Sequence, residues 1–193
     1  FRPVEVYLPE DWAQRLEQPV PSAAQYKWEF NNPQDIGWKV SENAQDLRVS
    51  GGILHFKVGD KPVRLQTAHQ DLNADFVNCL EVRMRVKPAE KTDRSLFSWA
   101  FVDYDMEQHG GSPFGEPREY PFTLRRDGEF HTYRLNLQEG YDLDWWGLRS
   151  AFCVQPTDRK GAEVDIDYIA FARLNSDELR ELSKIDPGRD RRG

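Results

Sequence analysis

Carboxylates at alternate positions are the most explicit chemical pattern in this sequence. Three such sets occur: Asp103, Asp105 and Glu107; Asp142 and Asp144; Asp165 and Asp167. Alternate residues of a strand point to the same side, so each set would bring oxygen atoms together. Their mutual repulsion favours a hard cation such as calcium, and the alternative is an edge of solvated charge. None of the sets continues into the glycine-containing loop of an EF-hand.

Aromatic side chains form a second pattern around residues 141–146. Two adjacent tryptophans, Trp145 and Trp146, cannot both face inward if this segment is extended. One of them, together with Tyr141, could stack on the C–H face of a sugar ring; alternatively, Trp146 fills the end of a core while Trp145 shields a loop. Tyr104 and His109 flank or lie in residues 105–117, whose glycines and prolines are typical of a binding loop or a mobile connection.

Arginines form the third pattern. Glu81, Arg83 and Arg85 alternate with apolar residues, so they share one side of a predicted strand. The opposite side is apolar: Leu80, Val82, Met84 and Val86. If the charged side is concave, the two guanidinium groups could bind a carboxylated or sulfated polysaccharide; if it is convex, they are solvated charge. Arg149 is a further candidate for such an anion contact.

Catalytic motifs are nearly absent. The sequence holds no G-x-S-x-G, no H-E-x-x-H, no phosphate-binding loop and no G-x-G-x-x-G. The four histidines are scattered, and His55 and His131 lie in predicted strands, where structural roles are favoured. The 33 acidic residues leave room for a glycosidase-type pair, but the sequence does not locate one. We therefore predict no catalytic residue.

The composition limits the classes of partner. A formal charge of −7 argues against nucleic acid, because binding phosphates requires concentrated Lys and Arg. No apolar run approaches the roughly 20 residues that a membrane span requires. The two cysteines, Cys79 and Cys153, are 74 positions apart, which leaves one disulfide and two free thiols equally open.

The elements that would position these groups are mostly strands. The clearest is 163–173, which alternates polar and apolar residues and then becomes almost wholly apolar, as a strand that ends buried on both sides would. Ten strands are predicted: 26–30, 37–40, 53–58, 63–68, 77–86, 96–104, 119–125, 130–137, 148–155 and 163–173. Pro121 restricts its strand to an edge or a bulge. Ten short strands separated by turn residues indicate an all-β fold, an antiparallel jelly-roll β-sandwich over residues 26–174.

Short helices are predicted on both flanks. Leu8, Trp12 and Leu16 indicate an amphipathic helix in an N-terminal arm, residues 1–25. Residues 175–193 are predicted to form a helix that Asn175 or Ser176 caps, followed by a linker. The N-terminal helix is too short to be stable alone, so we expect Trp12 to pack on the body or on a neighbouring domain.

Several segments together resemble a known family. They are Trp28–Phe30, Gly37–Trp38, Gly51–Leu54, Phe130–Leu137, Trp146–Arg149 with Pro156, and Val164–Ile169. The chain resembles bacterial jelly-roll carbohydrate-binding modules of the galactose-binding-like kind, which are appended to secreted polysaccharide-acting enzymes. The resemblance implies one structural calcium between the first and last strands. Glu29 or Asn31 would supply the first-strand ligand, and Asp165 or Asp167 the last-strand ligand.

The predicted function is a non-catalytic glycan-binding or accessory module of an extracytoplasmic polysaccharide-acting protein. Its partners would be a polysaccharide or oligosaccharide and a neighbouring domain. One cleft is predicted to be lined by Tyr104, His109, Tyr141, Trp145 and Trp146, with Arg83, Arg85 and Arg149 on a nearby face. Two alternatives remain open: a glycoside hydrolase or polysaccharide lyase acting through residues 103–119, and a structural domain that binds no sugar.

Overall fold

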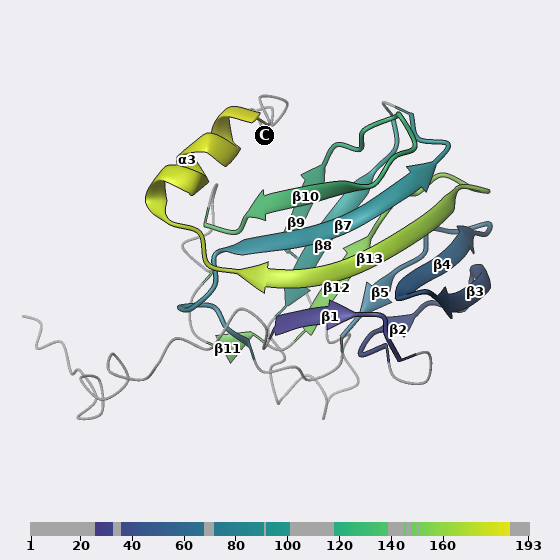
Figure 1. The fold of residues 1–193 in the computed structure, drawn as a ribbon, viewed down its shortest axis with the longest axis horizontal. Coiled ribbons are helices and arrows are strands. Elements are labelled where there is room, and N and C mark those ends of the chain that lie inside the picture. The colour runs from purple at the N-terminus through teal and green to yellow at the C-terminus, as the bar shows by residue number, and fades with distance from the viewer. Residues whose placement is uncertain are drawn as a thin grey trace, which may run out of the picture.

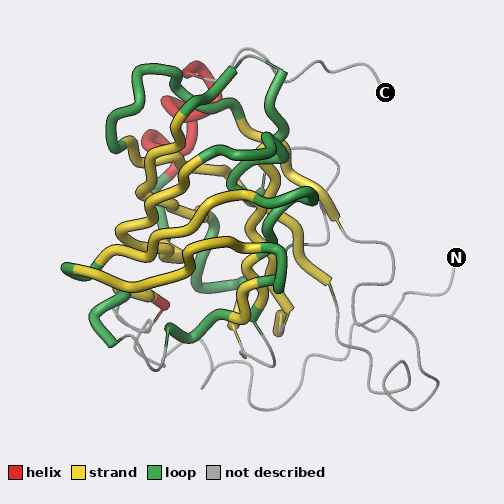
Figure 2. Tube along the Cα trace, turned by 90° about the vertical axis from the view of Figure 1, so that its right-hand side faces the viewer, coloured by secondary structure: helices red, strands yellow, loops and turns green. Residues whose placement is uncertain are grey.

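Two antiparallel β-sheets pack face to face around one apolar core (Figures 1 and 2). The computed structural model describes residues 26–32, 36–67, 72–90, 92–100, 118–138, 145, 148–149 and 151–185. The predicted arm and its helix lie outside these residues, as do residues 101–117 and 139–144. Within the described ranges, the predicted all-β sandwich is confirmed.

The first sheet has six strands. In spatial order they are β10 (His131–Asn136), β7 (Cys79–Lys87), β13 (Glu163–Ala172), β4 (Ile53–Val58) and β3 (Ala44–Ser50), with β1 (Lys27–Glu29) also paired to β13. The strand β13 is the centre of this sheet, because it pairs with β7 along one edge and with β4 and then β1 along the other. The predicted strand 163–173 is therefore confirmed, and it lies at the centre of the sheet.

The second sheet has five strands. In spatial order they are β2 (Lys39–Val40), β5 (Leu65–Gln66), β12 (Ala151–Gln155), β8 (Ser95–Ala100) and β9 (Arg118–Phe122). Pro121 lies in β9, which among the described strands pairs with β8 alone, so its predicted edge position is confirmed. A separate ladder joins β6 (Leu72–Asn73) to β11 (Leu148–Arg149). The predicted strand 148–155 is thus two strands that belong to different sheets.

Aromatic rings fill the space between the sheets. Phe171 on β13 lies 4.8 Å from Phe152 on β12 and 6.0 Å from Phe97 on β8, measured between ring centroids. All three side chains are fully buried. Rings of this size bury much apolar area, so they provide a large part of the driving force for packing one sheet on the other. Both cysteines are buried free thiols, which answers the question that their spacing left open.

The helix α3 (Ser176–Ile185) follows β13 directly. Its N-terminus is a capping box: Asn175 Oδ1 accepts hydrogen bonds from the backbone N–H groups of Asp177 and Glu178, both at 3.0 Å, and the Glu178 carboxylate accepts one from the Asn175 N–H at 2.8 Å. The predicted C-terminal helix and its cap are confirmed. No helix in the described part of the chain is long and apolar enough to cross a bilayer.

Candidate functional site

The solvent-facing side of the six-stranded sheet carries the densest set of functional side chains, and we call it the outer face. On β7, the side chains of Leu80, Val82, Met84 and Val86 are buried in the core. Glu81, Arg83 and Arg85 alternate with them, so their side chains point to the outer face. The predicted division of this strand into an apolar and a charged side is confirmed.

The first cross-strand row of the outer face joins Arg85, Asp165 and His55. The strand register places Asp165 on β13 directly between Arg85 on β7 and His55 on β4. Arg85 Nε donates a hydrogen bond to one oxygen of the Asp165 carboxylate, and His55 Nδ1 bonds to the other. The Asp165 side chain is only 14% exposed. Burial raises the pKa of Asp165, but its hydrogen bonds to Arg85 and His55 outweigh burial, so that the pKa lies below its ordinary value.

A second row lies one step further along the same strands. Tyr168 on β13 is paired in register with Arg83 on one side and with Glu29 of β1 on the other. The register between β13 and β7 shifts between Ile166 and Tyr168. Asp167 lies at this irregularity, and its carboxylate accepts a hydrogen bond from Arg83. On β1, Lys27 forms an ion pair with Glu29, the residue that is paired in register with Tyr168.

Two aromatic rings lie among these charges. The Phe130 ring has the guanidinium carbons of Arg83 and Arg85 at 5.1 and 4.8 Å from its centroid. The Tyr168 ring has Lys27 Nζ at 4.7 Å from its centroid. Both rings are partly exposed. Cation–π contacts of this kind hold the long basic side chains flat against the sheet, which leaves a surface of fixed donors, acceptors and ring edges.

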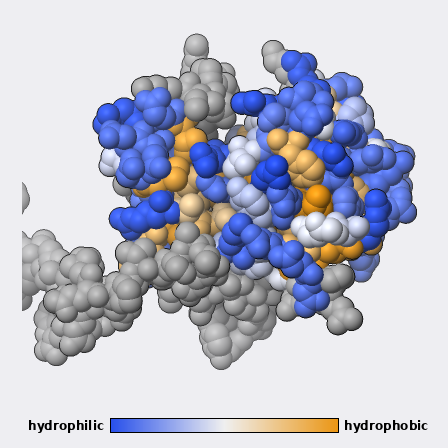
Figure 3. Space-filling view, viewed as in Figure 1, coloured by the Kyte–Doolittle hydropathy of each residue, from blue (hydrophilic) through white to orange (hydrophobic). Residues whose placement is uncertain are grey.

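A third row approaches the helix α3. Arg134 on β10 donates a hydrogen bond to Glu81 on β7 at 2.7 Å, and both side chains point to the outer face. Arg134 also lines a hollow together with residues of α3 and the segment before it. The other lining residues are Leu174, Asn175, Asp177, Glu178, Glu181 and Leu182. In Figure 3, apolar surface is visible beside the lobe that α3 forms, and further apolar patches lie among the polar residues over the rest of the face.

The charges of these rows balance. Arg83, Arg85, Arg134 and Lys27 each form an ion pair, and the partners are Asp167, Asp165, Glu81 and Glu29 respectively. Such pairs present N–H donors and carboxylate acceptors side by side without a net charge. This chemistry suits a ligand that both donates and accepts hydrogen bonds, and it suits a polyanion less well.

The four predicted calcium ligands do not fit a cation site as they are arranged. Asp165 and Asp167 are bonded to arginines, and Glu29 is bonded to Lys27 and to the side-chain amide of Asn31. Among the described residues, no group of three or more His, Cys, Asp or Glu side chains is arranged to hold a metal ion. Calcium would have to displace basic side chains from these carboxylates, so the calcium site stays a prediction without support from this geometry.

The prediction for Trp145 requires a correction. We expected one tryptophan of the pair to be exposed, with Trp145 as a candidate sugar platform. Its side chain is instead only 5% exposed and stacks on Phe171, with an interplanar angle of 17° and 6.2 Å between centroids. Its Nε1 donates a hydrogen bond to the Val77 carbonyl at 2.8 Å. Trp145 therefore belongs to the core and cannot stack on a ligand.

The remaining predicted cleft residues lie outside the described structure. Tyr104, His109, Tyr141 and Trp146 belong to undescribed segments, and of Arg149 only the backbone, in β11, is described. The predicted end-loop cleft therefore stays a prediction. Sequence reasoning missed His55, Phe130 and Tyr168 as members of the Arg83–Arg85 face. Parity in the predicted strands indicates an outward side chain for His55 and Phe130, but it groups Tyr168 with the buried Val164 and Ile166. The register shift after Ile166 changes the side of Tyr168, and the register between strands shows which residues are neighbours.

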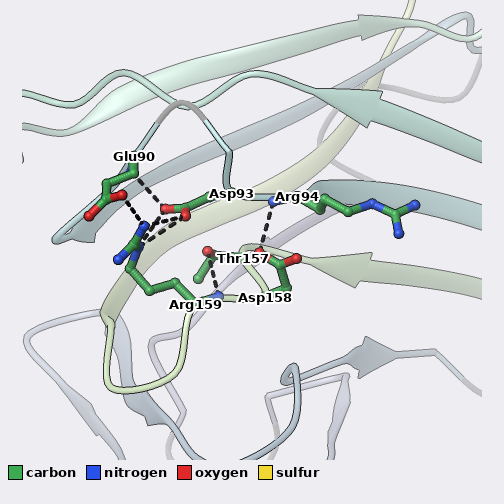
Figure 4. Close-up of polar contacts among 6 residues, drawn as sticks. All are labelled: Glu90, Asp93, Arg94, Thr157, Asp158 and Arg159. Atoms are coloured by element: carbon green, nitrogen blue, oxygen red, sulfur yellow. Dashed lines mark hydrogen bonds and ion pairs between the residues drawn. The ribbon is translucent and has the colours of Figure 1, made fainter.

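A second polar cluster connects two loops elsewhere on the sandwich (Figure 4). Arg159 Nε donates to both carboxylate oxygens of Asp93 at 3.0 Å, and its terminal nitrogen is 2.8 Å from the Glu90 carboxylate. The backbone N–H of Glu90 donates to Asp93 at 2.7 Å. Asp93 is only 4% exposed, and its pKa is lowered because the bonds from Arg159 and Glu90 outweigh its burial. Both carboxylate oxygens of Asp93 are hydrogen-bonded within the protein, so we interpret this cluster as a structural link between the two loops.

Comparison with known proteins supports the fold. No family model matches the chain, and no curated protein matches it. A solved carbohydrate-binding module specific for non-crystalline cellulose, CBM28, is similar at 14% identity with a TM-score of 0.51, covering 76% of this chain and 94% of that one. A family 29 module complexed with mannohexaose has 11% identity and a TM-score of 0.46, covering 77% and 91%. A xylan-binding CBM22 domain from Paenibacillus barcinonensis has 13% identity and a TM-score of 0.42, covering 77% and 94%.

The first of these likenesses defines the class of structure. The chain has the jelly-roll β-sandwich fold of a carbohydrate-binding module, over most of the length of both proteins. At 14% identity the likeness establishes this fold alone, and the two weaker likenesses add nothing to it. What the outer face binds has to be argued from its own side chains.

Proposed function

We propose that this protein is a non-catalytic glycan-binding module and that the outer face of the six-stranded sheet is its binding site. One observation carries the proposal: four ion pairs and two partly exposed aromatic rings lie on one face of the sandwich. Sugars carry hydroxyl groups that donate and accept, together with apolar C–H patches. Paired charges can bond the hydroxyls, and ring edges can contact the C–H patches.

The balance of charge favours a neutral polysaccharide. The sequence suggested that Arg83 and Arg85 bind a carboxylated or sulfated chain, yet each of them already bonds an aspartate. An anionic ligand would have to break these pairs and would meet the repulsion of Asp165 and Asp167. A neutral ligand can add hydrogen bonds at the free edges of the pairs. The module would serve a polysaccharide-acting protein outside the cytoplasm, as the fold and the sequence resemblance suggest.

Affinity electrophoresis tests this proposal. The protein should be retarded in gels that contain neutral polysaccharides, such as xylan, mannan or soluble cellulose derivatives, and much less in gels with pectate or alginate. Arg83→Ala should remove most of the retardation, since it removes both a donor and the group that orients Asp167. Arg64→Ala is the control, because Arg64 is the same residue type and more exposed than Arg83 but precedes β5 of the other sheet.

Three results would contradict the proposal. If no glycan retards the protein, the alternative of a structural domain that binds no sugar would remain. Release of reducing sugars or of unsaturated ends from a polysaccharide would indicate an enzyme. Equal effects of the Arg83 and Arg64 substitutions would place the binding site elsewhere on the molecule.

A further inference from the structure

Two lysines lie at the end of the outer face where β13 begins. Glu163 is the first residue of β13, and the register pairs it with Lys57 on β4 and with Lys87 on β7. Each of the three lies two positions along its strand from a member of the first cross-strand row, so their side chains point to the same side of the sheet as that row. Figure 1 shows this end of the sheet opposite the helix α3.

Arg48 on β3 adds a third cation. The register pairs it with His55, so it continues the first cross-strand row towards the edge of the sheet. Its guanidinium group donates a hydrogen bond to the backbone carbonyl of Asp46 at 3.3 Å. Arg48 is exposed, as is Lys87, and Lys57 is half-buried. The three cations therefore surround one corner of the outer face.

These three cations differ from the other cations of the face in having no carboxylate partner among the described residues. The four basic side chains considered above each form an ion pair. Glu163 lies between Lys57 and Lys87, and it too forms no ion pair with a described residue. The unpaired charge at this corner is therefore mainly positive, although the chain as a whole carries a formal net charge of −7.

The stem of Lys87 is held in place by the turn before β10. Gly128 lies in this turn with a φ of 72°, and a Cβ atom added to it would lie 2.8 Å from Lys87 Cε and 3.3 Å from Lys87 Cγ. The aliphatic stem of Lys87 thus packs directly on the backbone of Gly128, at a position where glycine provides both the backbone conformation and the space. This contact keeps the ammonium group of Lys87 at the corner.

We propose that Arg48, Lys57 and Lys87 form a subsite for an acidic side group of the polysaccharide, so that the preferred ligand is a neutral chain with sparse carboxylates. This inference rests on the proposed function and names the class of its ligand. Successive outward residues of a strand are about 7 Å apart, so the lysines lie beside the row that contains Asp165. A side group can reach them while neutral sugars contact the paired charges. A chain with a carboxylate on every sugar would meet the repulsion of Asp165 and Asp167.

Glu163 weakens this subsite and thereby provides a test of it. Neighbouring strands are about 4.8 Å apart, so Lys57 and Lys87 are about 10 Å apart with Glu163 between them. A carboxylate that binds to either ammonium group is therefore repelled by Glu163. Removing this charge should strengthen the binding of an acidic ligand, whereas removing either lysine charge should weaken it. A general loss of packing cannot produce effects of opposite sign.

Isothermal titration calorimetry tests the preference with two pairs of soluble polysaccharides. The first pair is glucuronoxylan and its carboxyl-reduced form, and the second is mannan lightly oxidised at C6 and the untreated polymer. In a pair that binds, the acidic form should bind about fivefold more tightly, and the preference should disappear as the salt concentration rises from roughly 0.01 M to 1 M. Equal affinities within a pair would overturn the subsite but leave the proposed function standing. Binding of none of the four polymers would overturn both.

Four single substitutions test which residues cause the preference, measured as the ratio of the affinities for the acidic and the neutral form. Lys57→Gln and Lys87→Gln should each lower this ratio about two- to fivefold, and Glu163→Gln should raise it by a similar factor. Lys39→Gln is the matched control, because it removes the same charge from an exposed lysine on β2 of the other sheet. It should leave the ratio unchanged. Equal ratios for the Lys39, Lys57 and Lys87 variants, or a lower ratio for Glu163→Gln, would overturn the subsite.

Discussion

At the scale of single residues, the fate of each charge on the outer face depends on its cross-strand partners. The alternation of β7 predicted that Arg83 and Arg85 point outward, and they do. The alternation gave no information on the partners of these arginines. Asp165 lies 80 positions from Arg85 in the sequence, and His55 lies 110 positions from Asp165. The interaction depends on strand register, and register depends on how the whole sheet assembles. For this reason, the sequence suggested free arginines where the structure has ion pairs.

Asp165 allows a test of this pairing. Asp165→Asn should lower the free energy of unfolding at pH 7 by about 2 kcal/mol, because it removes charge-assisted hydrogen bonds to Arg85 and His55. The folded pKa of Asp165 is depressed below its ordinary 3.8, so the stabilisation is complete above about pH 5 and is lost as the pH falls through the lowered pKa. The difference between parent and variant in urea unfolding should therefore shrink towards pH 3.

The control for this experiment is Asp60→Asn. Asp60 pairs with Lys160, but its side chain is 82% exposed, and water competes for such a pair. Its replacement should leave the stability unchanged at both pH values. A parent–variant difference for Asp165→Asn that is the same at pH 7 and pH 3 would contradict the role of the ionised carboxylate.

At the scale of elements, the period of two was a reliable guide only where one side of a strand is buried. The strands β4, β7 and β13 were predicted nearly to the residue. The strand β3 was missed because its residues are almost all exposed, so that no apolar alternation marks it. The predicted strand 148–155 was too long because β11 and β12 are consecutive in sequence but belong to different sheets. Helix α3 was predictable because its cap is local.

Trp145 packs in the core against Phe171 and Phe152, and it was misjudged because these neighbours come from strands distant in sequence from one another. Trp145→Ala should cost about 3–5 kcal/mol of stability, as expected for removing a large buried ring. Trp145→Phe keeps most of the packing and loses only the hydrogen bond to the Val77 carbonyl, so it should cost about 1–2 kcal/mol. Chemical unfolding followed by circular dichroism measures both. If the Trp145→Ala variant keeps normal stability but no longer binds glycan, the original prediction that Trp145 stacks on a sugar would be correct.

At the scale of the whole molecule, the open question from the sequence is whether a metal joins the first strand to the last. In the described structure, strand pairing already joins β1 to β13, and the carboxylates of the predicted site are bonded to Lys27, Arg83 and Arg85. We therefore expect the melting temperature to agree within about 1 °C between millimolar calcium and excess chelator. A rise of several degrees with calcium, abolished by Glu29→Gln or Asp165→Asn, would show that the predicted site exists.

The position of β13 has a consequence for how the protein is made. This strand ends at residue 172, and it joins β7, β4 and β1, which begin as early as residue 27. During synthesis the hairpin β3–β4 can form early and β10 can pair with β7 later, but the edges that β13 will occupy stay unpaired until nearly the whole domain has left the ribosome. Contacts of such long sequence separation make folding slow, and unpaired edges invite association with other chains. The domain therefore depends on its last strand arriving before another chain pairs with these edges.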